Sequence, residues 1–261
     1  MSNNYWAERM AKQQEKLSNT NIKDTEAQLI KYYEKTYQHT VEEFEATYNK
    51  ILSTMNKEGR TPTPADLYKL DKYWQLQTRT KFALEKLGRW EYKLFSKQFT
   101  KQWLDIYLGL ALPSSEHFAT PSYENIEQMI NQIWCADGKS WSDRIWNNTS
   151  KLQEELNQGL LDCVVSGKTT RDLKNILQER FNVSYGRADS IVRTEIAHIQ
   201  TQAAQQRYKD SGVQMVQVWA DYDERRCDVC GKLHEKLFPI GAQMPIPAHP
   251  KCRCSIIPVV E

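Results

Sequence analysis

Apolar side chains recur in the first part of the chain at intervals that alternate between three and four residues. From Ile30 to Met55 they line one face of a helix, at Ile30, Tyr33, Tyr37, Val41, Phe44, Tyr48, Ile51 and Met55. This spacing is close to a heptad repeat and predicts a long amphipathic helix. Gly59 and the sequence Thr61-Pro-Thr-Pro64 end that helix, and Thr63 with Pro64 can begin the next one.

A second long helix is predicted from about Ala65 to Leu112, with Gly88 as a candidate bend. The apolar side of its C-terminal half carries Tyr92, Phe95, Phe99, Trp103, Ile106 and Leu110. We expect the two helices to pair as an antiparallel hairpin through their aromatic faces. A linker rich in Pro and Ser follows, ending at Pro121. The chain is therefore divided into a helical arm, residues 1–120, and a C-terminal domain, residues 121–261.

The opposite side of the second helix is basic. Its cations are Lys86, Arg89, Lys93, Lys97 and Lys101. Between Arg79 and Lys101 there are seven basic residues and two acidic ones. Such a stripe is commonly a solvated helix face, which is the interpretation we favour. The alternative is a contact for a phosphate backbone or an acidic partner.

The middle of the chain is also predicted to be helical, and the pattern changes after Gly212. The expected helices run from Ser122 to Trp134, from about Ser140 to Leu160, from Thr169 to about Phe181 and from Tyr185 to Asp210. Thr169 and Asp172 form a capping box, and Gly212 is a natural C-terminal cap. The segments Val213–Trp219 and Cys252–Val260 have strand composition. The predicted fold class is mainly α, with helices over 121–211 and a small α+β module over 212–261.

Overall composition excludes several classes of protein. The 261 residues carry a formal net charge of +2, which provides no general attraction to nucleic acid or to a membrane surface. Residues 1–16 are polar and do not resemble a signal peptide. The apolar runs are too short for a membrane span. We expect an intracellular soluble protein without a membrane partner.

Five good ligands for a soft metal ion lie in two clusters near the C-terminus. Cys227 and Cys230 form a C-x2-C pair, and after eighteen residues come His249, Cys252 and Cys254. This spacing predicts one structural Zn²⁺ per chain, bound by the first pair and two of the other three residues. The connecting loop is rich in Pro and Gly, so a metal would clamp the C-terminal hairpin. His234 is a weaker sixth candidate, and disulfide bonds are the alternative in an oxidising compartment.

The last hundred residues resemble the phage Mu F-like head morphogenesis family. The motifs that carry this resemblance are Arg193-Thr194-Glu195, the C-x2-C pair at Cys227, and the sequence from His249 to Cys254. The resemblance implies a minor capsid protein that associates with the portal protein and with other capsid or scaffold proteins during assembly. It further implies a place inside the virion near the portal, after assembly in the host cytoplasm, and makes DNA a candidate partner. Residues 1–120 lie outside the resemblance.

The Arg-Thr-Glu motif has two interpretations. On one helix, Arg193 and Glu195 are about 200° apart, so we expect each to contact a different neighbour. A structural role is the prediction, because no second carboxylate or His cluster indicates an open metal site. We therefore predict no enzymatic activity and no small-molecule substrate. The alternatives are a zinc-containing nuclease or a DNA-binding protein in the same phage setting.

Overall fold

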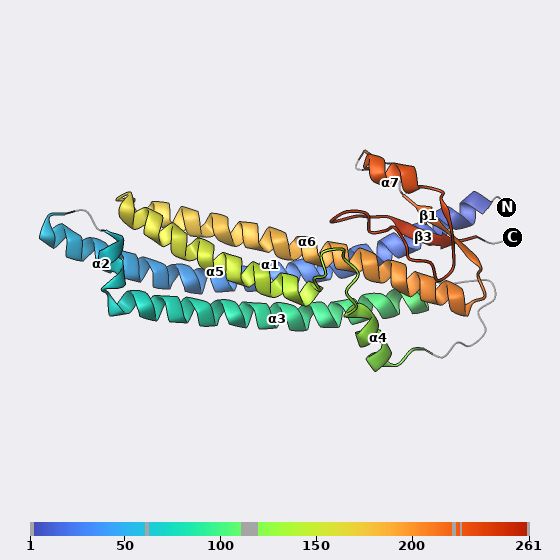
Figure 1. Cartoon of the computed structure of the whole chain (residues 1–261), viewed down its shortest axis with the longest axis horizontal. Helices are drawn as coiled ribbons and strands as arrows, with labels where there is room; N and C mark the ends of the chain where they lie inside the picture. The colour runs from blue at the N-terminus through green and yellow to red at the C-terminus, as the bar shows by residue number, and fades with distance from the viewer. Residues whose placement is uncertain (1–2, 61–62, 111–119, 221–222, 225, 260–261) are drawn as a thin grey trace. The chain divides into compact units, whose positions relative to one another are not determined.

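The structure is a computed structural model and describes residues 3–60, 63–110, 120–220, 223–224 and 226–259. The mainly helical fold class is confirmed (Figure 1). The helices are α1 (Asn3–Glu58), α2 (Pro64–Tyr68), α3 (Asp71–Gly109), α4 (Tyr123–Ile130), α5 (Trp141–Val165), α6 (Thr170–Asp210) and α7 (Asp228–Leu233). The strands are β1 (Met215–Trp219), β2 (Leu237–Pro239) and β3 (Ser255–Pro258).

Two breaks between helices differ from the prediction. The second long helix is divided, because α2 ends at a C-cap on Lys69 and α3 begins at Asp71. Thr63 is the N-cap residue of α2, and the Asp66 carboxylate accepts its backbone N–H at 2.8 Å. The two helices predicted over 169–210 are one continuous helix, α6, which passes through the expected break.

Other predicted ends are confirmed. The Ser122 hydroxyl accepts the Asn125 N–H at 3.3 Å and caps α4. The Asp172 carboxylate accepts the Thr169 N–H at 2.9 Å, which is one half of the predicted capping box. Gly212 has a φ of +78° after the end of α6, a conformation that favours glycine. Local side-chain and backbone chemistry thus predicted these ends correctly.

Contacts divide the chain into two compact units. The bundle unit comprises Ala27–Lys93 and Ser142–Asp189, and the sheet unit comprises Met1–Glu26, Leu94–Trp141 and Ser190–Glu261. Each unit combines segments from both sides of the predicted boundary at residue 120. The linker itself falls largely on residues 111–119, outside the described part of the chain. The division into 1–120 and 121–261 therefore stays a prediction.

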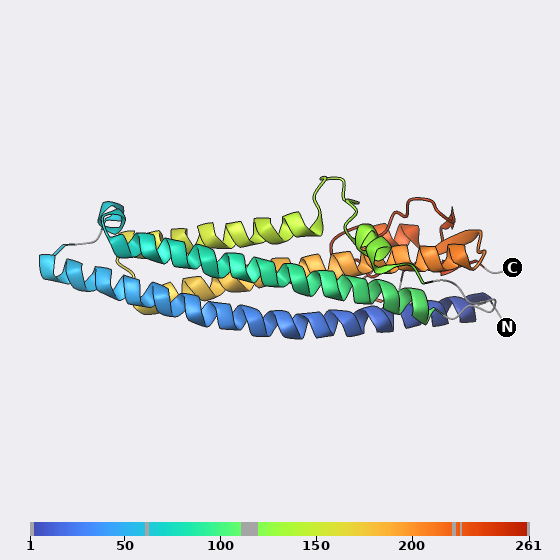
Figure 2. The same ribbon diagram turned by 90° about the horizontal axis from the view of Figure 1, so that it is seen from below.

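The bundle unit is a set of four antiparallel helical segments, from α1, α3, α5 and α6, which run side by side in both views (Figure 1 and Figure 2). The α1–α3 pair is joined by Tyr33 with Glu91 at 2.7 Å and by Glu43 with Arg79 at 3.3 Å. The α1–α6 pair is joined by a perpendicular contact of the Tyr37 and Phe181 rings. The predicted antiparallel pairing of the first two long helices is confirmed within this unit.

The sheet unit contains a three-stranded antiparallel sheet in the order β2-β1-β3. Alternate residues of β1, Val216 and Val218, are fully buried, so one face of the strand packs inward. The Tyr208 hydroxyl of α6 donates to the Ile256 carbonyl of β3 at 3.2 Å. Gln14 of α1 donates to the same carbonyl at 2.8 Å. The sheet is thereby anchored to α6, which directly precedes it in the sequence, and to α1, which is distant from it.

Candidate metal centre and the Arg-Thr-Glu helix

The first arm of the candidate metal centre is built by the start of α7. The Cys227 sulfur accepts the Cys230 backbone N–H at 3.4 Å, and the Cys227 carbonyl accepts the Gly231 N–H at 2.9 Å. This tight turn places the Cys227 and Cys230 sulfurs on one side of the backbone. The C-x2-C spacing predicted the turn but not the short helix α7.

The second arm precedes β3. Cys252 and Cys254 are buried, whereas Arg253 between them is exposed, as expected for an extended segment whose side chains alternate. Arg253 binds the Asp223 carboxylate through two hydrogen bonds, of 2.8 and 2.6 Å. Lys251 has a φ of +60°, in the left-handed region, where the chain turns between His249 and Cys252.

All five predicted ligands come together. Cys227, Cys230 and His249 form one group, and Cys230, Cys252 and Cys254 form another; within each, the ligand atoms lie within 4.8 Å of one another. The Cys230 sulfur is 3.2 Å from His249 Nε2 and 3.7 Å from the Cys252 sulfur. Two sulfurs of a tetrahedral zinc site are separated by about 3.8 Å, given a Zn–S distance of about 2.3 Å. The spacing therefore fits a zinc ion.

The weaker candidate, His234, lies outside both groups. Its Nδ1 accepts the Ala220 backbone N–H at 3.2 Å, and its ring meets the Trp219 ring at a centroid distance of 4.9 Å. No disulfide joins the described cysteines.

The electrostatics of the thiol cluster also suit a cation. The hydrogen bond from Cys254 lowers the pKa of Cys252 to about 5 and raises the pKa of Cys254. Burial raises the pKa of Cys230 to about 12. Neighbouring thiols in a buried cluster cannot all ionise, because their negative charges repel. A divalent cation would remove this conflict and hold several thiolates together.

His249 is oriented as a metal ligand would be. A carbonyl oxygen can only accept, so the contact of 2.9 Å between Nδ1 and the Pro250 carbonyl makes Nδ1 the donor. This leaves Nε2, the atom near Cys230, free of a proton in the neutral ring. Metal-bound histidines commonly have such a backbone partner on the other ring nitrogen.

The three residues of the Arg-Thr-Glu motif contact different neighbours. Arg193 forms an ion pair with Glu26 of α1. The Thr194 hydroxyl accepts the backbone N–H of Lys251 at 3.1 Å, and so connects α6 to the second metal arm. Glu195 is buried and accepts the Trp134 indole N–H at 2.9 Å. This agrees with the expectation that Arg193 and Glu195 point to separate partners.

The comparison with known protein families identifies the same region of the chain. Residues 152–257 match the family described as Phage Mu protein F like protein. The resemblance inferred from the motifs is confirmed, and it supports a phage head morphogenesis protein. No curated protein and no solved structure is significantly similar to the chain.

The Mu F-like region, residues 152–257, begins within α5 and ends in β3. It includes both metal arms and the Arg-Thr-Glu motif. Residues 1–151, with all of α1 and α3, lie outside it.

One contact beside the motif was not predicted. The Trp134 and His198 rings stack at a centroid distance of 4.2 Å, with an interplanar angle of 11°. Burial lowers the pKa of His198 to about 4, so the ring is neutral at physiological pH. His198 follows Glu195 by three residues, so both face Trp134 from one side of α6. That helical spacing was the only signal available in the sequence.

The basic residues of α3 are placed on its exposed surface. Lys86, Arg89 and Lys93 belong to the bundle unit, Lys97 and Lys101 to the sheet unit, and all five are exposed. Arg89 is paired with Glu85 at 3.3 Å, and Lys101 with Asp105 at 2.8 Å. Exposure is compatible with a solvated face and with a contact surface alike. Among the described helices, none is long and apolar enough to cross a membrane.

Proposed function

We propose that this protein is a minor capsid component that enters the phage prohead close to the portal and has no catalytic turnover. The observation that carries the proposal is the family match over residues 152–257, which includes both arms of the candidate metal centre. In this proposal the Mu F-like region is the assembly module, and its partners are the portal protein and other capsid or scaffold proteins.

One structural zinc ion per chain stabilises this module in the proposal. Four further donors lie around the Cys230 sulfur, so that five are present in all, one more than a closed tetrahedral site needs. The ligands would be Cys227 and Cys230 with two of His249, Cys252 and Cys254. Zinc suits this set better than a hard cation, because all the donors are thiols or imidazole.

Metal analysis of the purified, reduced protein tests the metal centre. We expect one zinc per chain, and we expect Cys227→Ser to lose it while the helical circular dichroism signal stays nearly unchanged. Cys135→Ser, which changes a cysteine outside both groups, is the matched control and should keep its zinc. Wild-type protein that is fully folded without metal would contradict this part of the proposal.

Incorporation into proheads tests the function. We expect few copies of the wild-type protein per prohead, and a clear loss of incorporation and infectivity for Cys227→Ser relative to Cys135→Ser. Equal incorporation of both variants would refute an assembly role for the metal module.

A zinc nuclease is the competing function, and it needs a coordination position that is open to water or substrate. The surplus of protein donors argues against one. Glu195, the only acid of the motif, is buried against Trp134. Metal-dependent DNA cleavage by the purified protein that is abolished by Glu195→Gln would establish the nuclease instead.

The exposed cations of α3 support DNA binding as a second alternative. Reversing the charge of Lys93 and Lys97 would then weaken binding, and binding would fall steeply with salt. We expect the double variant to change DNA affinity little. A salt-sensitive interaction that disappears in the variant would favour the DNA-binding function.

A further inference from the structure

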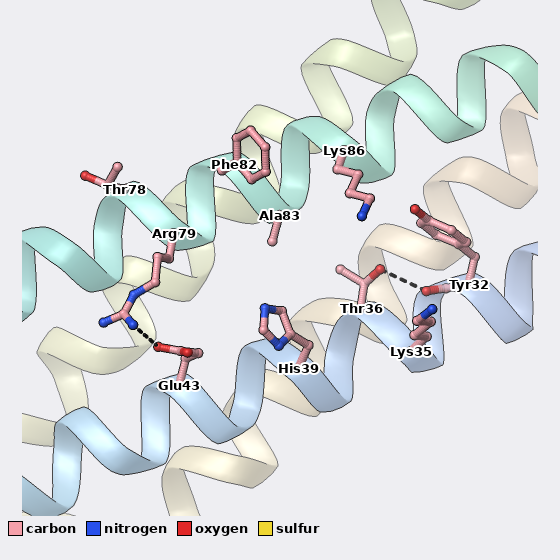
Figure 3. A pocket seen from close by; sticks show the side chains of 10 residues that line it. All are labelled: Tyr32, Lys35, Thr36, His39, Glu43, Thr78, Arg79, Phe82, Ala83 and Lys86. Carbon is pink, nitrogen blue, oxygen red and sulfur yellow. Dashed lines mark hydrogen bonds and ion pairs between the residues drawn. The ribbon is translucent and has the colours of Figure 1, made fainter.

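A groove on the bundle unit lies between α1 and α3, outside the Mu F-like region. Its volume is about 480 Å³. Figure 3 shows Thr36 and His39 of α1 facing Ala83 of α3 across it, and Phe82 of α3 also lines it. The hollow arises because Thr36 and Ala83 are small where the helices face each other. At one end the Arg79–Glu43 ion pair of 3.3 Å connects the two helices.

The wall on α3 carries a large exposed aromatic side chain. Phe82 is 65% exposed, and Trp74, two turns earlier on the same helix, is 57% exposed. Residues eight positions apart lie on the same face of a helix. Phe82 lines the hollow, whereas Trp74 lies outside it, and an exposed aromatic side chain that lines a hollow is typical of the anchor points of protein interfaces.

The rim of the groove is positively charged. Lys35 on α1 and Lys86 on α3 both line it and are exposed. Neither lysine has an ion-pair partner among the residues that the structure describes, whereas Arg79 is already neutralised by Glu43. Two uncompensated ammonium groups therefore flank an apolar floor. An occupant with separated carboxylates and one apolar face would complement this pattern.

We propose that this groove binds an acidic, amphipathic helical segment of a partner protein. An apolar side chain of the segment fills the hollow above Ala83 and packs against Phe82, while its carboxylates pair with Lys35 and Lys86. This is helix-in-groove recognition, in which anchors at helical spacing supply affinity and charges supply specificity. A continuous phosphate backbone fits less well, because it has no apolar side chain to fill the hollow and pack against Phe82. The proposal does not depend on the head-assembly function, since the groove lies outside the matched residues.

Fluorescence anisotropy with the purified full chain tests the proposal. The first probe is a labelled helical peptide with leucines at helical spacing and glutamates on the other face. The second has the same composition in an order that destroys the apolar face, the third replaces every glutamate by lysine, and the fourth is a short DNA duplex. We expect the chain to bind the first probe at least roughly tenfold more tightly than the second and third.

Amino-acid substitutions test whether the first probe binds in the groove. Phe82→Ala and the double change Lys35→Glu with Lys86→Glu should each weaken the first complex roughly tenfold. Tyr123→Ala changes a residue of the sheet unit that is 73% exposed, and Lys151→Glu changes an exposed lysine of α5, so both serve as controls without effect. Lys35→Glu and Lys86→Glu are combined in one double variant, and the other substitutions are made as single variants. Circular dichroism confirms that each variant is folded.

Three outcomes would overturn the proposal. The first is equal binding of the first and second probes. The second is DNA binding that Phe82→Ala or the lysine changes abolish. The third is a concentration-dependent dimer of the chain that Phe82→Ala dissociates, which would make a second copy the occupant.

Discussion

At the scale of single residues, the bundle unit contains a carboxyl group where a helical core normally has none. Glu91 is 1% exposed, and its Oε1 accepts the Tyr33 hydroxyl at 2.7 Å. Asn148 donates to the Tyr33 oxygen at 3.2 Å and to the Ser184 carbonyl at 3.0 Å. Glu91 Oε2 has no hydrogen-bond partner among the described residues. Burial raises the pKa of Glu91 to about 8, despite the opposing effect of the Tyr33 hydrogen bond.

This raised pKa predicts that stability falls as pH rises. Between the ordinary pKa of about 4.5 and the folded value of about 8, the folded chain holds a proton that the unfolded chain has lost. Glu91→Gln should remove this penalty and raise the free energy of unfolding at pH values above 8 by about 1–3 kcal/mol. Below the ordinary pKa, the variant should gain nothing.

Urea unfolding at an acidic and an alkaline pH measures the effect. Glu85→Gln is the control, because Glu85 lies on the same helix with its side chain 41% exposed. It should change stability by less than about 0.5 kcal/mol at either pH. A Glu91→Gln variant with the same pH dependence as the wild type would disprove the assignment.

Thr194 of α6 is a second residue whose role is defined by its hydrogen bonds in the folded chain. Its hydroxyl donates to the Ser190 carbonyl at 2.6 Å and accepts the Lys251 N–H at 3.1 Å. Thr194→Val keeps the shape but removes the acceptor, so the second metal arm loses an attachment of about 1 kcal/mol. With zinc bound, we expect the metal to be released to a chelator roughly fivefold faster.

Thr201→Val is the matched control for this prediction. Thr201 is a buried threonine of the same helix, and its hydroxyl donates to the Ala197 carbonyl at 3.0 Å. An unchanged release rate in Thr194→Val, or an equal increase in Thr201→Val, would show that the Lys251 contact is without consequence.

At the scale of elements, α6 is one continuous helix across the break that was predicted between Phe181 and Tyr185. Gly186 lies within α6 and is exposed, with open space where a Cβ would stand. Gly159 on α5 differs, because a Cβ there would lie 2.8 Å from Ile176 Cγ2 of α6. Gly186 lowers the helix propensity of α6 and permits no closer packing in return. Gly159, in contrast, permits the close approach of α5 and α6.

We therefore expect alanine substitutions at the two glycines to change the stability of the chain in opposite directions. Gly186→Ala should stabilise the chain by about 0.5–1 kcal/mol, through helix propensity. Gly159→Ala gains the same propensity but overpacks the contact with Ile176, and should destabilise by about 1–3 kcal/mol. Urea unfolding of both variants compares them directly. Stabilisation by Gly159→Ala would mean that Ile176 can move aside without cost.

At the scale of the whole molecule, neither compact unit is a continuous piece of chain. In the sheet unit, Ser18 of α1 donates to Gln200 of α6 at 2.5 Å, and Gln102 of α3 donates to Ser18 at 2.6 Å. In the bundle unit, Tyr33 of α1 contacts both α3 and α6. Each core is thus completed by residues that precede position 111.

We therefore predict that residues 121–261 alone do not fold into a stable monomer. The fragment would expose the apolar faces that α1 and α3 cover, so it should self-associate and unfold without a cooperative transition. Co-expression with residues 1–112 should restore a soluble complex with cooperative unfolding. Size-exclusion chromatography and circular dichroism distinguish the outcomes, and a monomeric fragment with a cooperative transition would contradict the prediction.

The sequence by itself determined the features that depend on neighbours within a few residues. The caps at Thr63, Ser122 and Thr169, the left-handed Gly212 and the apolar stripe of α1 all follow from local geometry. The clustering of the five candidate ligands was predictable for a similar reason, since two short turns each aim their donors to one side. The Mu F-like resemblance depended on these same short motifs.

Tertiary structure decided the remaining features, because these features depend on residues that are far apart in the chain. The helix α6 continues across the break predicted between Phe181 and Tyr185, where Phe181 packs on Tyr37 of α1 and the Ser184 carbonyl accepts from Asn148 of α5. The attachment of Thr194 to Lys251 spans 57 positions, and the Tyr33–Glu91 pair spans 58. No sequence pattern within one helix indicates which of its polar residues will be enclosed by the other three helices. Burial, and with it the pKa of Glu91, is a property of the assembled core.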